Sequence, residues 1–354
     1  MIKFGLIGSG FMADTWLRVG LNSQVASVIG VSGGRTAESF AKENSIKLYQ
    51  SVSELCESDA LDAVVITSPE QFHFEQAKSA ILAKKHVLVE KPFTISVAEV
   101  KELLELARDS NVVIGVVSQN RNRFALRTAK ALILEGQIGE LHFINVAGDV
   151  EYWWGLGDDG SWKKKLDQLN LWASWASHAC DLINFLSDDS AVSVFATANQ
   201  EDIPPLNRNV GAIFKMSKGI MSVVHLSHTE FVPKRRPTME FEIIGTEGVL
   251  KFDTHGSVEL RKPGSSKRYG AELDQKQGQI SYLDKSVVLN PIRLGAYQAQ
   301  LDDFASAVMT KSVPEVDGIA GLKTQLMVCG ALESIETGKL IATSIGDDAS
   351  QQAV

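Results

Sequence analysis

The chain has 354 residues, a length that favours two domains over one. Hydrophobic residues make up 44% of it and charged residues 22%, and its formal net charge is −8. This balance is typical of a globular protein, and it argues against the concentrated basic surface that nucleic-acid binding requires.

Cysteine usage and the N-terminal sequence predict the compartment. Cys56, Cys180 and Cys329 are scattered and lack metal-ligand spacing, so we expect reduced thiols, no disulfide framework and no bound metal. No apolar run reaches the roughly 20 residues of a membrane span. Residues 1–7 run directly into a strand, which leaves no room for a signal peptide. We therefore expect a soluble, cytoplasmic protein that binds neither membrane nor nucleic acid.

The first part of the chain alternates short apolar runs with helical patterns. Strands are expected at residues 2–7, 25–31, 63–67, 86–89 and 112–117, and helices at 12–21, 36–43, 74–81 and 97–107. Repeated strand–helix–strand units imply a parallel sheet with helices on both faces. The expected fold is therefore α/β, with a doubly wound parallel sheet in residues 1–120.

The pattern changes after residue 120. A helix at 126–134 precedes strand-like stretches at 141–150, 192–198, 210–216, 220–226, 238–244 and 249–252. Turns of hairpin length, such as Ser217-Lys218-Gly219, join several of them. Further helices are expected at 172–186, 295–309 and 318–337. These elements predict a second domain, residues 121–345, built on an antiparallel sheet.

A glycine-rich loop follows the first strand and opens the first helix, with the sequence Gly8-Ser9-Gly10-Phe11-Met12-Ala13. The first glycine permits a tight turn, the second lets a pyrophosphate approach the main chain, and Ala13 keeps helix and strand close. The free amides of the helix N-terminus attract phosphate. We therefore predict a dinucleotide site here, and its residues are Gly8, Gly10, Phe11, Met12 and Ala13.

The end of the second strand bears on the choice of cofactor. An acidic residue about 20 positions after the loop would hold the ribose 2′-hydroxyl of NAD. Residues 31–35 read Val-Ser-Gly-Gly-Arg and contain no acid. A hydroxyl at Ser32, the flexible Gly33 and a guanidinium at Arg35 suit a 2′-phosphate, which favours NADP over NAD. The alternative is that Arg35 is only a solvated residue at a helix start.

The residues Glu90-Lys91-Pro92 follow the expected strand at 86–89. In open α/β sheets this carboxyl end of a strand is where ligands bind. Proline fixes the backbone, so the ammonium of Lys91 is held in place, where it can bond to a substrate oxygen or exchange a proton with it. Taken alone, Lys91 could equally be a solvated residue at a strand end.

Together with Ser68-Pro69-x-x-x-His73 and Gly245-Thr246-Glu247-Gly248, these motifs resemble the Gfo/Idh/MocA oxidoreductase family over nearly the whole chain. The resemblance implies an N-terminal Rossmann domain and a C-terminal α/β domain with a large open, mainly antiparallel sheet. It implies homodimers or homotetramers formed through that sheet, and a C-terminal helix, about 318–338, that packs back on the Rossmann domain. It also implies hydride transfer between NAD(P) and a secondary alcohol or ketone.

The resemblance assigns roles to individual residues. Lys91 matches the family's catalytic lysine, and His73 and Glu90 would lie beside the nicotinamide ribose. Gln119 and Arg121 match positions that flank cofactor or substrate. The cofactor-binding residues that it implies beyond the loop and the second strand are Ser68, His73, Glu90, Lys91, Gln119 and Arg121.

The chain departs from the family pattern on one helix of the second domain. Members carry Asp-x-Gly-x-His there, a spacing that places both polar side chains on one face. Here the residues are Ser174-Trp175-Ala176-Ser177-His178, followed by Asp181. We predict His178 as a general acid or base beside Lys91, with Ser174 supplying a hydroxyl but no charge. Asp181 either orients the imidazole or forms a surface pair.

Tryptophans are concentrated near this helix, since five of the six lie within 23 residues, from Trp153 to Trp175. Core packing accounts for some of them, but as a group they suggest an aromatic wall for a sugar face or an aryl group. The substrate-binding residues predicted from the family positions and this wall are Lys91, Arg121, Trp153, Trp162, Trp172, Ser174, Trp175 and His178.

The sequence thus predicts an NAD(P)-dependent dehydrogenase or reductase acting on CH–OH groups of a sugar, polyol or aryl-glycoside-like small molecule. One alternative is a dehydrogenase of a cyclic hemiacetal or hydroxy-acid from aromatic catabolism, a family branch that also lacks the aspartate but lacks the lysine as well. Another is NAD-dependent, redox-assisted glycoside cleavage. A non-enzymatic dinucleotide sensor is the third, and the retention of Lys91 and His178 argues against it.

Overall fold

The computed structural model describes residues 1–151, 171–199, 209–229, 238–270 and 291–344. The chain forms two compact units. The first unit contains Met1–Gln119 and Val288–Gln325, and the second contains Asn120–Val287 and Leu326–Val354. The return to the first unit spans residues 288–325, so it begins earlier in the chain than the helix at about 318–338 that the family resemblance implied would pack back on the Rossmann domain.

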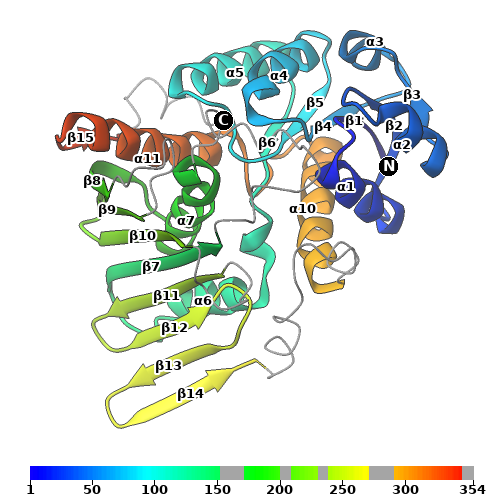
Figure 1. Ribbon diagram of the computed structural model, residues 1–354. Coiled ribbons are helices and arrows are strands. Elements are labelled where there is room, and N and C mark those ends of the chain that lie inside the picture. Colours follow the sequence, from blue (N-terminus) through cyan, green and yellow to red (C-terminus); the bar gives the residue numbers. More distant parts are fainter. Residues whose placement is uncertain (152–170, 200–208, 230–237, 271–290, 345–354) are drawn as a thin grey trace. The chain divides into compact units, whose positions relative to one another are not determined.

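The first unit is built on a parallel sheet of six strands in the order β3-β2-β1-β4-β5-β6 (Figure 1). The strands are β1 (Ile2–Ile7), β2 (Ala26–Ser32), β3 (Lys47–Leu48), β4 (Ala63–Ile66), β5 (His86–Val89) and β6 (Ile114–Val116). This is the order of a dinucleotide-binding Rossmann sheet, which confirms the predicted fold of this part. Ligands bind such sheets at the carboxyl ends of the strands, beside the point where the strand order reverses.

Helices connect these strands, and all of them except α3 lie where apolar spacing predicts a helix. They are α1 (Phe11–Asn22), α2 (Ala37–Asn44), α3 (Val52–Glu57), α4 (His73–Leu82) and α5 (Val97–Ser110). Helix α5 is capped at its N-terminus, because Ser96 Oγ accepts a hydrogen bond from Glu99 N at 3.3 Å. The short elements α3 and β3 were not predicted, because each is too short to show a period in the sequence.

The returning helix α10 (Pro291–Thr310) lies along α1 (Figure 1). The ring of Tyr297 meets Trp16 edge-on, with centroids 5.3 Å apart. Helix α10 also contacts the end of β6: Gln300 Nε2 donates to Val116 O at 2.7 Å, and Gln300 Oε1 accepts from Ser118 N at 2.9 Å. The return therefore completes the first unit by covering α1 and fixing the chain just after β6.

The second unit is built on a nine-stranded sheet in the order β14-β13-β12-β11-β7-β10-β9-β8-β15. The strands are β7 (Leu141–Glu151), β8 (Ala191–Asn199), β9 (Asn209–Met216), β10 (Met221–Thr229), β11 (Thr238–Gly245), β12 (Val249–Asp253), β13 (Val258–Lys262), β14 (Ser265–Tyr269) and β15 (Ile341–Ala342). Only β7 and β10 pair in parallel, so the predicted mainly antiparallel sheet is confirmed.

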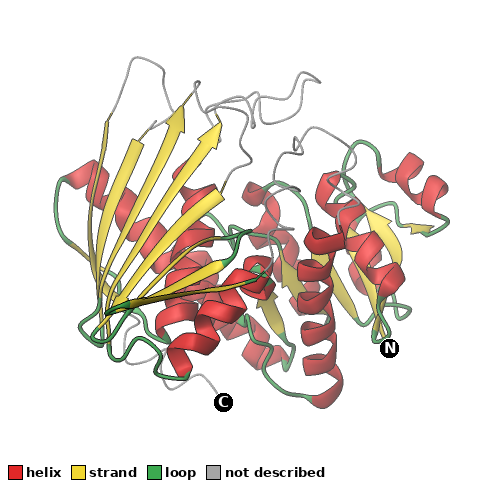
Figure 2. Cartoon of the chain, turned by 90° about the horizontal axis from the view of Figure 1, so that it is seen from below, coloured by secondary structure: helices red, strands yellow, loops and turns green. Residues whose placement is uncertain are grey.

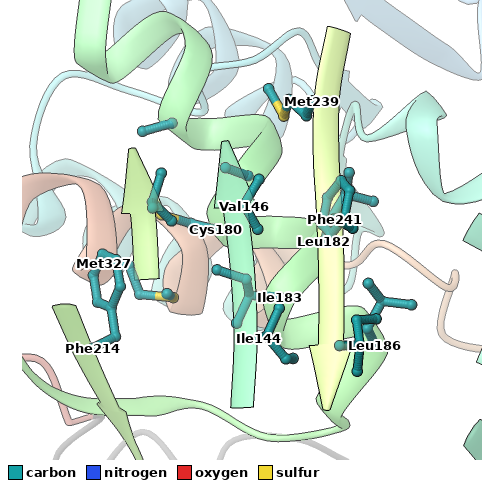
Figure 3. Close-up of a cluster of buried hydrophobic side chains, with 14 of the residues drawn as sticks. Ile144, Val146, Cys180, Leu182, Ile183, Leu186, Phe214, Met239, Phe241 and Met327 are labelled. Carbon is teal, nitrogen blue, oxygen red and sulfur yellow. The ribbon is translucent and has the colours of Figure 1, made fainter. Parts of the chain in front are cut away.

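The core of the second unit lies between one face of this sheet and its helices α6 (Phe124–Leu134), α7 (Leu171–Ser187) and the end of α11 (Gly318–Thr337) (Figure 2). Side chains of α7 such as Ile183 and Leu186 pack among strand residues such as Ile144 and Phe241 (Figure 3). On the opposite face, Phe195 and Ile213 are 44% and 50% exposed. The sheet is therefore covered by described helices on one face only.

Candidate active site

The glycine loop between β1 and α1 has the geometry that a pyrophosphate needs. Gly8 has a φ of 115°, and an added Cβ there would lie 2.7 Å from Thr67 Oγ1. At Gly10 an added Cβ would meet nothing within 4 Å. The helix begins at Phe11, with Gly10 as its N-cap and no side chain bonded to its first amides. An open cradle that ends in helix amides fits a dinucleotide phosphate.

The first turn of α1 is held by an arginine of α10. The guanidinium of Arg293 lies 4.9 Å from the ring centre of Phe11, and its Nη2 donates to Thr15 Oγ1 at 3.0 Å and contacts Met12 Sδ at 3.9 Å. Ala13 is completely buried, as the expected close contact between helix and strand requires. Arg293 was not predicted as a residue of this site, since it lies 281 residues from Met12 in the chain.

The end of β2 differs from expectation at Ser32. This residue is completely buried and its Oγ has no hydrogen-bond partner among the described residues, so the hydroxyl is not presented to a ligand. Gly33 has a φ of 77°, and Arg35 is exposed. Thr36 Oγ1 donates to Ser9 O at 3.0 Å and lies 2.9 Å from Ser9 Oγ. This unpredicted contact joins the end of β2 to the glycine loop.

Glu90 and Lys91, which follow β5, are two charged residues with limited access to solvent. Glu90 is 5% exposed; its Oε1 accepts from Trp16 Nε1 at 2.9 Å, and its Oε2 accepts from Lys91 N at 3.2 Å. Burial raises the pKa of Glu90, while the Trp16 and Lys91 contacts oppose that rise. Lys91 is partly exposed, and burial lowers the pKa of its ammonium against the opposing charges of Glu90 and Glu70. A lysine of lowered pKa at this sheet edge releases its proton more readily than an ordinary lysine, which suits an exchange of protons with a substrate oxygen.

Two of the positions expected beside a nicotinamide ribose, Glu90 and His73, are buried and bonded to other groups of the protein. Glu90 bonds to Trp16, as described, and His73 is only 1% exposed. His73 Nδ1 lies 2.9 Å from Pro92 O, and its Nε2 lies 2.9 Å from Ser68 O. Burial lowers the pKa of this imidazole. His73 therefore ties the loop after β4 to the step after β5, and its ring nitrogens are already engaged.

Arg121, expected to flank cofactor or substrate, forms a buried ion pair with Asp181 of α7. Arg121 Nε donates to Asp181 Oδ2 at 2.9 Å and Nη2 donates to Oδ1 at 2.5 Å, and both side chains are less than one-tenth exposed. The guanidinium also lies 5.3 Å from the ring centre of Phe185. The burial of this ion pair excludes the surface pair considered for Asp181.

Gln119 lies two residues before Arg121 in the chain. It is 6% exposed, and its Oε1 has no partner among the described residues.

Helix α7 carries the remaining predicted residues of the second unit. His178 is 8% exposed, and Trp175, one turn earlier, meets its ring edge-on with centroids 6.3 Å apart. Ser174 is partly exposed. Trp172 is 2% exposed and donates from Nε1 to Val328 O at 3.2 Å, so it belongs to the hydrophobic core rather than to a pocket wall. Trp153 and Trp162 lie outside the described residues.

Each unit therefore offers a distinct set of groups. The first supplies a phosphate cradle and the ammonium of Lys91, and the second supplies the imidazole of His178 beside an aromatic ring. Within the described ranges, no three or more His, Cys, Asp or Glu side chains are grouped to hold a metal ion. The helices in those ranges are also too short or too polar to cross a membrane.

Two family models match the chain. Residues 2–118 match the one described as the oxidoreductase family with an NAD-binding Rossmann fold. Residues 126–251 match the one described as the GFO/IDH/MocA C-terminal domain. The two matches fall in the first and second units respectively.

Individual proteins show the same likeness. The 1,5-anhydro-D-fructose reductase of Ensifer adhaerens is 28% identical over 358 residues, which cover 96% of this chain and 100% of that protein. The scyllo-inositol 2-dehydrogenase (NADP(+)) of Bacillus subtilis strain 168 is 35% identical over 117 residues, 32% of this chain and 36% of its own. The crystal structure of an oxidoreductase from Agrobacterium radiobacter in complex with NAD+, L-tartaric acid and magnesium has a TM-score of 0.83 at 18% identity. It covers 97% of this chain and 98% of its own, and it shows the shared fold.

Proposed function

Because the chain belongs to the Gfo/Idh/MocA family of oxidoreductases, we propose that it transfers a hydride between NADP and a secondary alcohol or ketone of a sugar or polyol. The observation that carries the proposal is Lys91, a partly exposed lysine of lowered pKa at the carboxyl end of β5. The cofactor, when bound, supplies the hydride donor or acceptor. The protein supplies binding, orientation and a place for the proton of the substrate hydroxyl.

The named residues divide this work. The amides that follow Gly10 hold the pyrophosphate, and Lys91 bonds to the substrate oxygen and exchanges its proton. His178 is the second proton-handling group, because an imidazole changes its charge near neutral pH. Trp175 offers a ring face for a sugar or an aryl group. The names of the Ensifer and Bacillus relatives support a polyhydroxylated substrate.

A substrate panel tests the reaction. Sugars, inositols, aryl glycosides and hydroxy-acids are assayed by the absorbance of reduced cofactor with wild type, Lys91→Met and His178→Asn. Each variant should lower kcat by about 10²- to 10⁴-fold, because it removes a proton-transfer group. Lys78→Met is the control, since Lys78 is a surface residue paired with Glu102.

The outcomes separate the candidate functions. Unchanged turnover in Lys91→Met would remove that residue from the mechanism. Tight dinucleotide binding without turnover of any compound in the panel would favour the dinucleotide-sensing alternative. Product formation without net reduced cofactor would favour redox-assisted glycoside cleavage.

We propose NADP rather than NAD as the cofactor because of the residues at the end of β2. Residues 31–35 contain no carboxylate to repel a 2′-phosphate, and Arg35 is exposed. The name of the Bacillus relative, which specifies NADP(+), supports the same choice. In fluorescence titrations the wild type should bind NADPH more tightly than NADH, and Arg35→Gln should lose about tenfold of that preference. Arg18→Gln, at a surface arginine paired with Asp14, should not change it. Tighter binding of NADH by the wild type would overturn the proposal.

We also propose that copies of the chain, as dimers or tetramers, associate through the open face of the nine-stranded sheet. Phe195 pairs across strands with Ile213, and Ile213 with Val223, which forms an apolar row on the face that no described helix covers. Light scattering of the wild type should show an oligomer, and Ile213→Lys should dissociate it. Lys267→Glu, on the exposed edge strand β14, is the matched control.

A further inference from the structure

A hydrogen bond connects the helix behind the glycine loop with the residue next to Lys91. Trp16 of α1 is completely buried, and its indole Nε1 donates to Glu90 Oε1 at 2.9 Å across 74 residues of chain. The indole packs edge-on against Tyr297 at 5.3 Å, with the two rings at 88°. This packing fixes the direction of the N–H, so the bond to Glu90 is a preformed feature of the fold.

The Glu90 carboxylate is held at both oxygens and faces two cations. Oε1 accepts from Trp16, and Oε2 accepts from the main-chain N–H of Lys91. The charged groups near it are Lys91 itself and Arg293 of α10, and Lys91 in turn is near Glu70. A buried carboxyl in this position takes its charge only with the help of such donors and cations.

We propose that Trp16 is a positioning residue that acts through Glu90: its N–H keeps the carboxylate charged beside Lys91, and thereby couples helix α1 to the protonation of the lysine. The catalytic consequence rests on the proposed role of Lys91, but the coupling itself belongs to the free protein. Trp16 touches neither substrate nor reacting atoms in this assignment. Its effect reaches them through the charge of one neighbour.

The direction of the effect follows from the burial of both partners. Burial raises the pKa of Glu90 and lowers that of Lys91, so it brings the charged pair and the neutral pair closer in free energy than they would be in water. The indole N–H stabilises the carboxylate, so it favours the charged pair. Without that N–H the carboxyl gains a proton more easily, and Lys91 then loses its own proton at a lower pH. Removing the carboxylate altogether shifts the titration of Lys91 in the same direction and by a larger amount.

The test measures the titration of Lys91 in the cofactor-free protein. Lysines are reductively methylated with ¹³C, and the signal that is missing in Lys91→Arg is followed by NMR against pH. Glu90→Gln should move the titration about one pH unit or more to lower pH. Trp16→Phe, which keeps an aromatic ring against Tyr297 but lacks the N–H, should move it in the same direction by less.

A double variant and a packing control decide how Trp16 acts. If it acts through Glu90, Trp16→Phe should add no further shift in the Glu90→Gln background. Phe304→Leu, at a buried aromatic of the same core, should leave the titration in place. An unshifted titration in Trp16→Phe, or an equal shift with and without Glu90, would refute the proposal. The titration of Lys91 could shift as expected in these variants while the pH dependence of kcat stays unchanged. That result would support the coupling of Trp16 to Lys91 and would contradict the proposed proton-transfer role of Lys91.

Discussion

The two units hold their functional groups by different means. In the first unit, main-chain atoms at strand ends hold the functional groups. Gly8, with a φ of 115°, forms the turn of the phosphate cradle, and the carbonyls of Ser68 and Pro92 hold His73. In the second, α7 is held by side chains, above all the buried pair of Asp181 with Arg121. Main-chain geometry depends on a few neighbouring residues, whereas a buried charge pair fails as soon as one partner is removed.

The largest expected effect comes from breaking that buried pair. Asp181→Asn leaves the Arg121 guanidinium in a site less than one-tenth exposed without its carboxylate. We expect a loss of about 3–5 kcal/mol in the free energy of unfolding, measured by urea titration. Replacing both partners, as Arg121→Met with Asp181→Leu, should recover most of it, because no charge is then left buried.

The matched control lies at the end of the same helix. Asp188 is 3.9 Å from Lys218, and its side chain is 86% exposed, so Asp188→Asn should change the unfolding free energy by less than about 0.5 kcal/mol. Equal losses at the two positions would mean that Asp181 contributes no more than a surface charge, and the claim that buried side chains hold α7 in the second unit would then be wrong.

The same contrast explains what the sequence could predict. The glycine loop and the Glu90-Lys91-Pro92 step are contiguous motifs, and the turn and strand end that each one requires are visible in a few residues. Short apolar runs predict the strands of the first sheet, and strand-like stretches joined by hairpin-length turns predict those of the second, for the same local reason. The β13–β14 hairpin escaped prediction because β14 is a polar edge strand with four exposed residues and no apolar alternation.

The rest of the site depends on contacts between distant residues. Arg293 approaches Thr15 and Phe11 only because α10 returns to α1. The sequence of residues 291–310 does not predict which helix α10 packs against. The burial of His73 and Ser32 likewise follows from the packing of neighbouring loops. The sequence therefore indicated His73 and Ser32 as candidate residues but not which way their side chains face, and it gave no indication of Arg293.

The next expected effect tests whether the main-chain cradle serves the ligand or the fold. An added Cβ at Gly10 meets no protein atom within 4 Å, and its φ of −88° suits alanine, so Gly10→Ala should fold normally. If a pyrophosphate approaches there, the methyl group occupies its space, and NADPH affinity should fall about tenfold or more in fluorescence titrations. Gly295→Ala, at another open glycine, is the control. Unchanged affinity in Gly10→Ala would place the phosphate elsewhere.

The smallest expected effect concerns His73, which the main chain of the first unit encloses. Its pKa in the folded protein is lowered by burial from an ordinary value of 6.5. On acidification the unfolded chain therefore binds a proton at His73 more readily than the folded chain does. The contribution of neutral His73 to the free energy of unfolding is complete above about pH 6.5 and decreases below it. This contribution is at most about 1.4 kcal/mol per pH unit.

Urea unfolding at several pH values between about 8 and 5 measures that slope. His73→Gln should be less stable at high pH, because it loses contacts with the Ser68 and Pro92 carbonyls, but its stability should fall less steeply on acidification. The slope should not vanish, since burial also lowers the pKa of His86. His142→Gln, at an exposed position of β7, should follow the wild-type curve. A variant curve parallel to the wild type would mean that His73 accepts its proton in the folded protein, as an imidazole between two carbonyl oxygens does when both ring nitrogens donate.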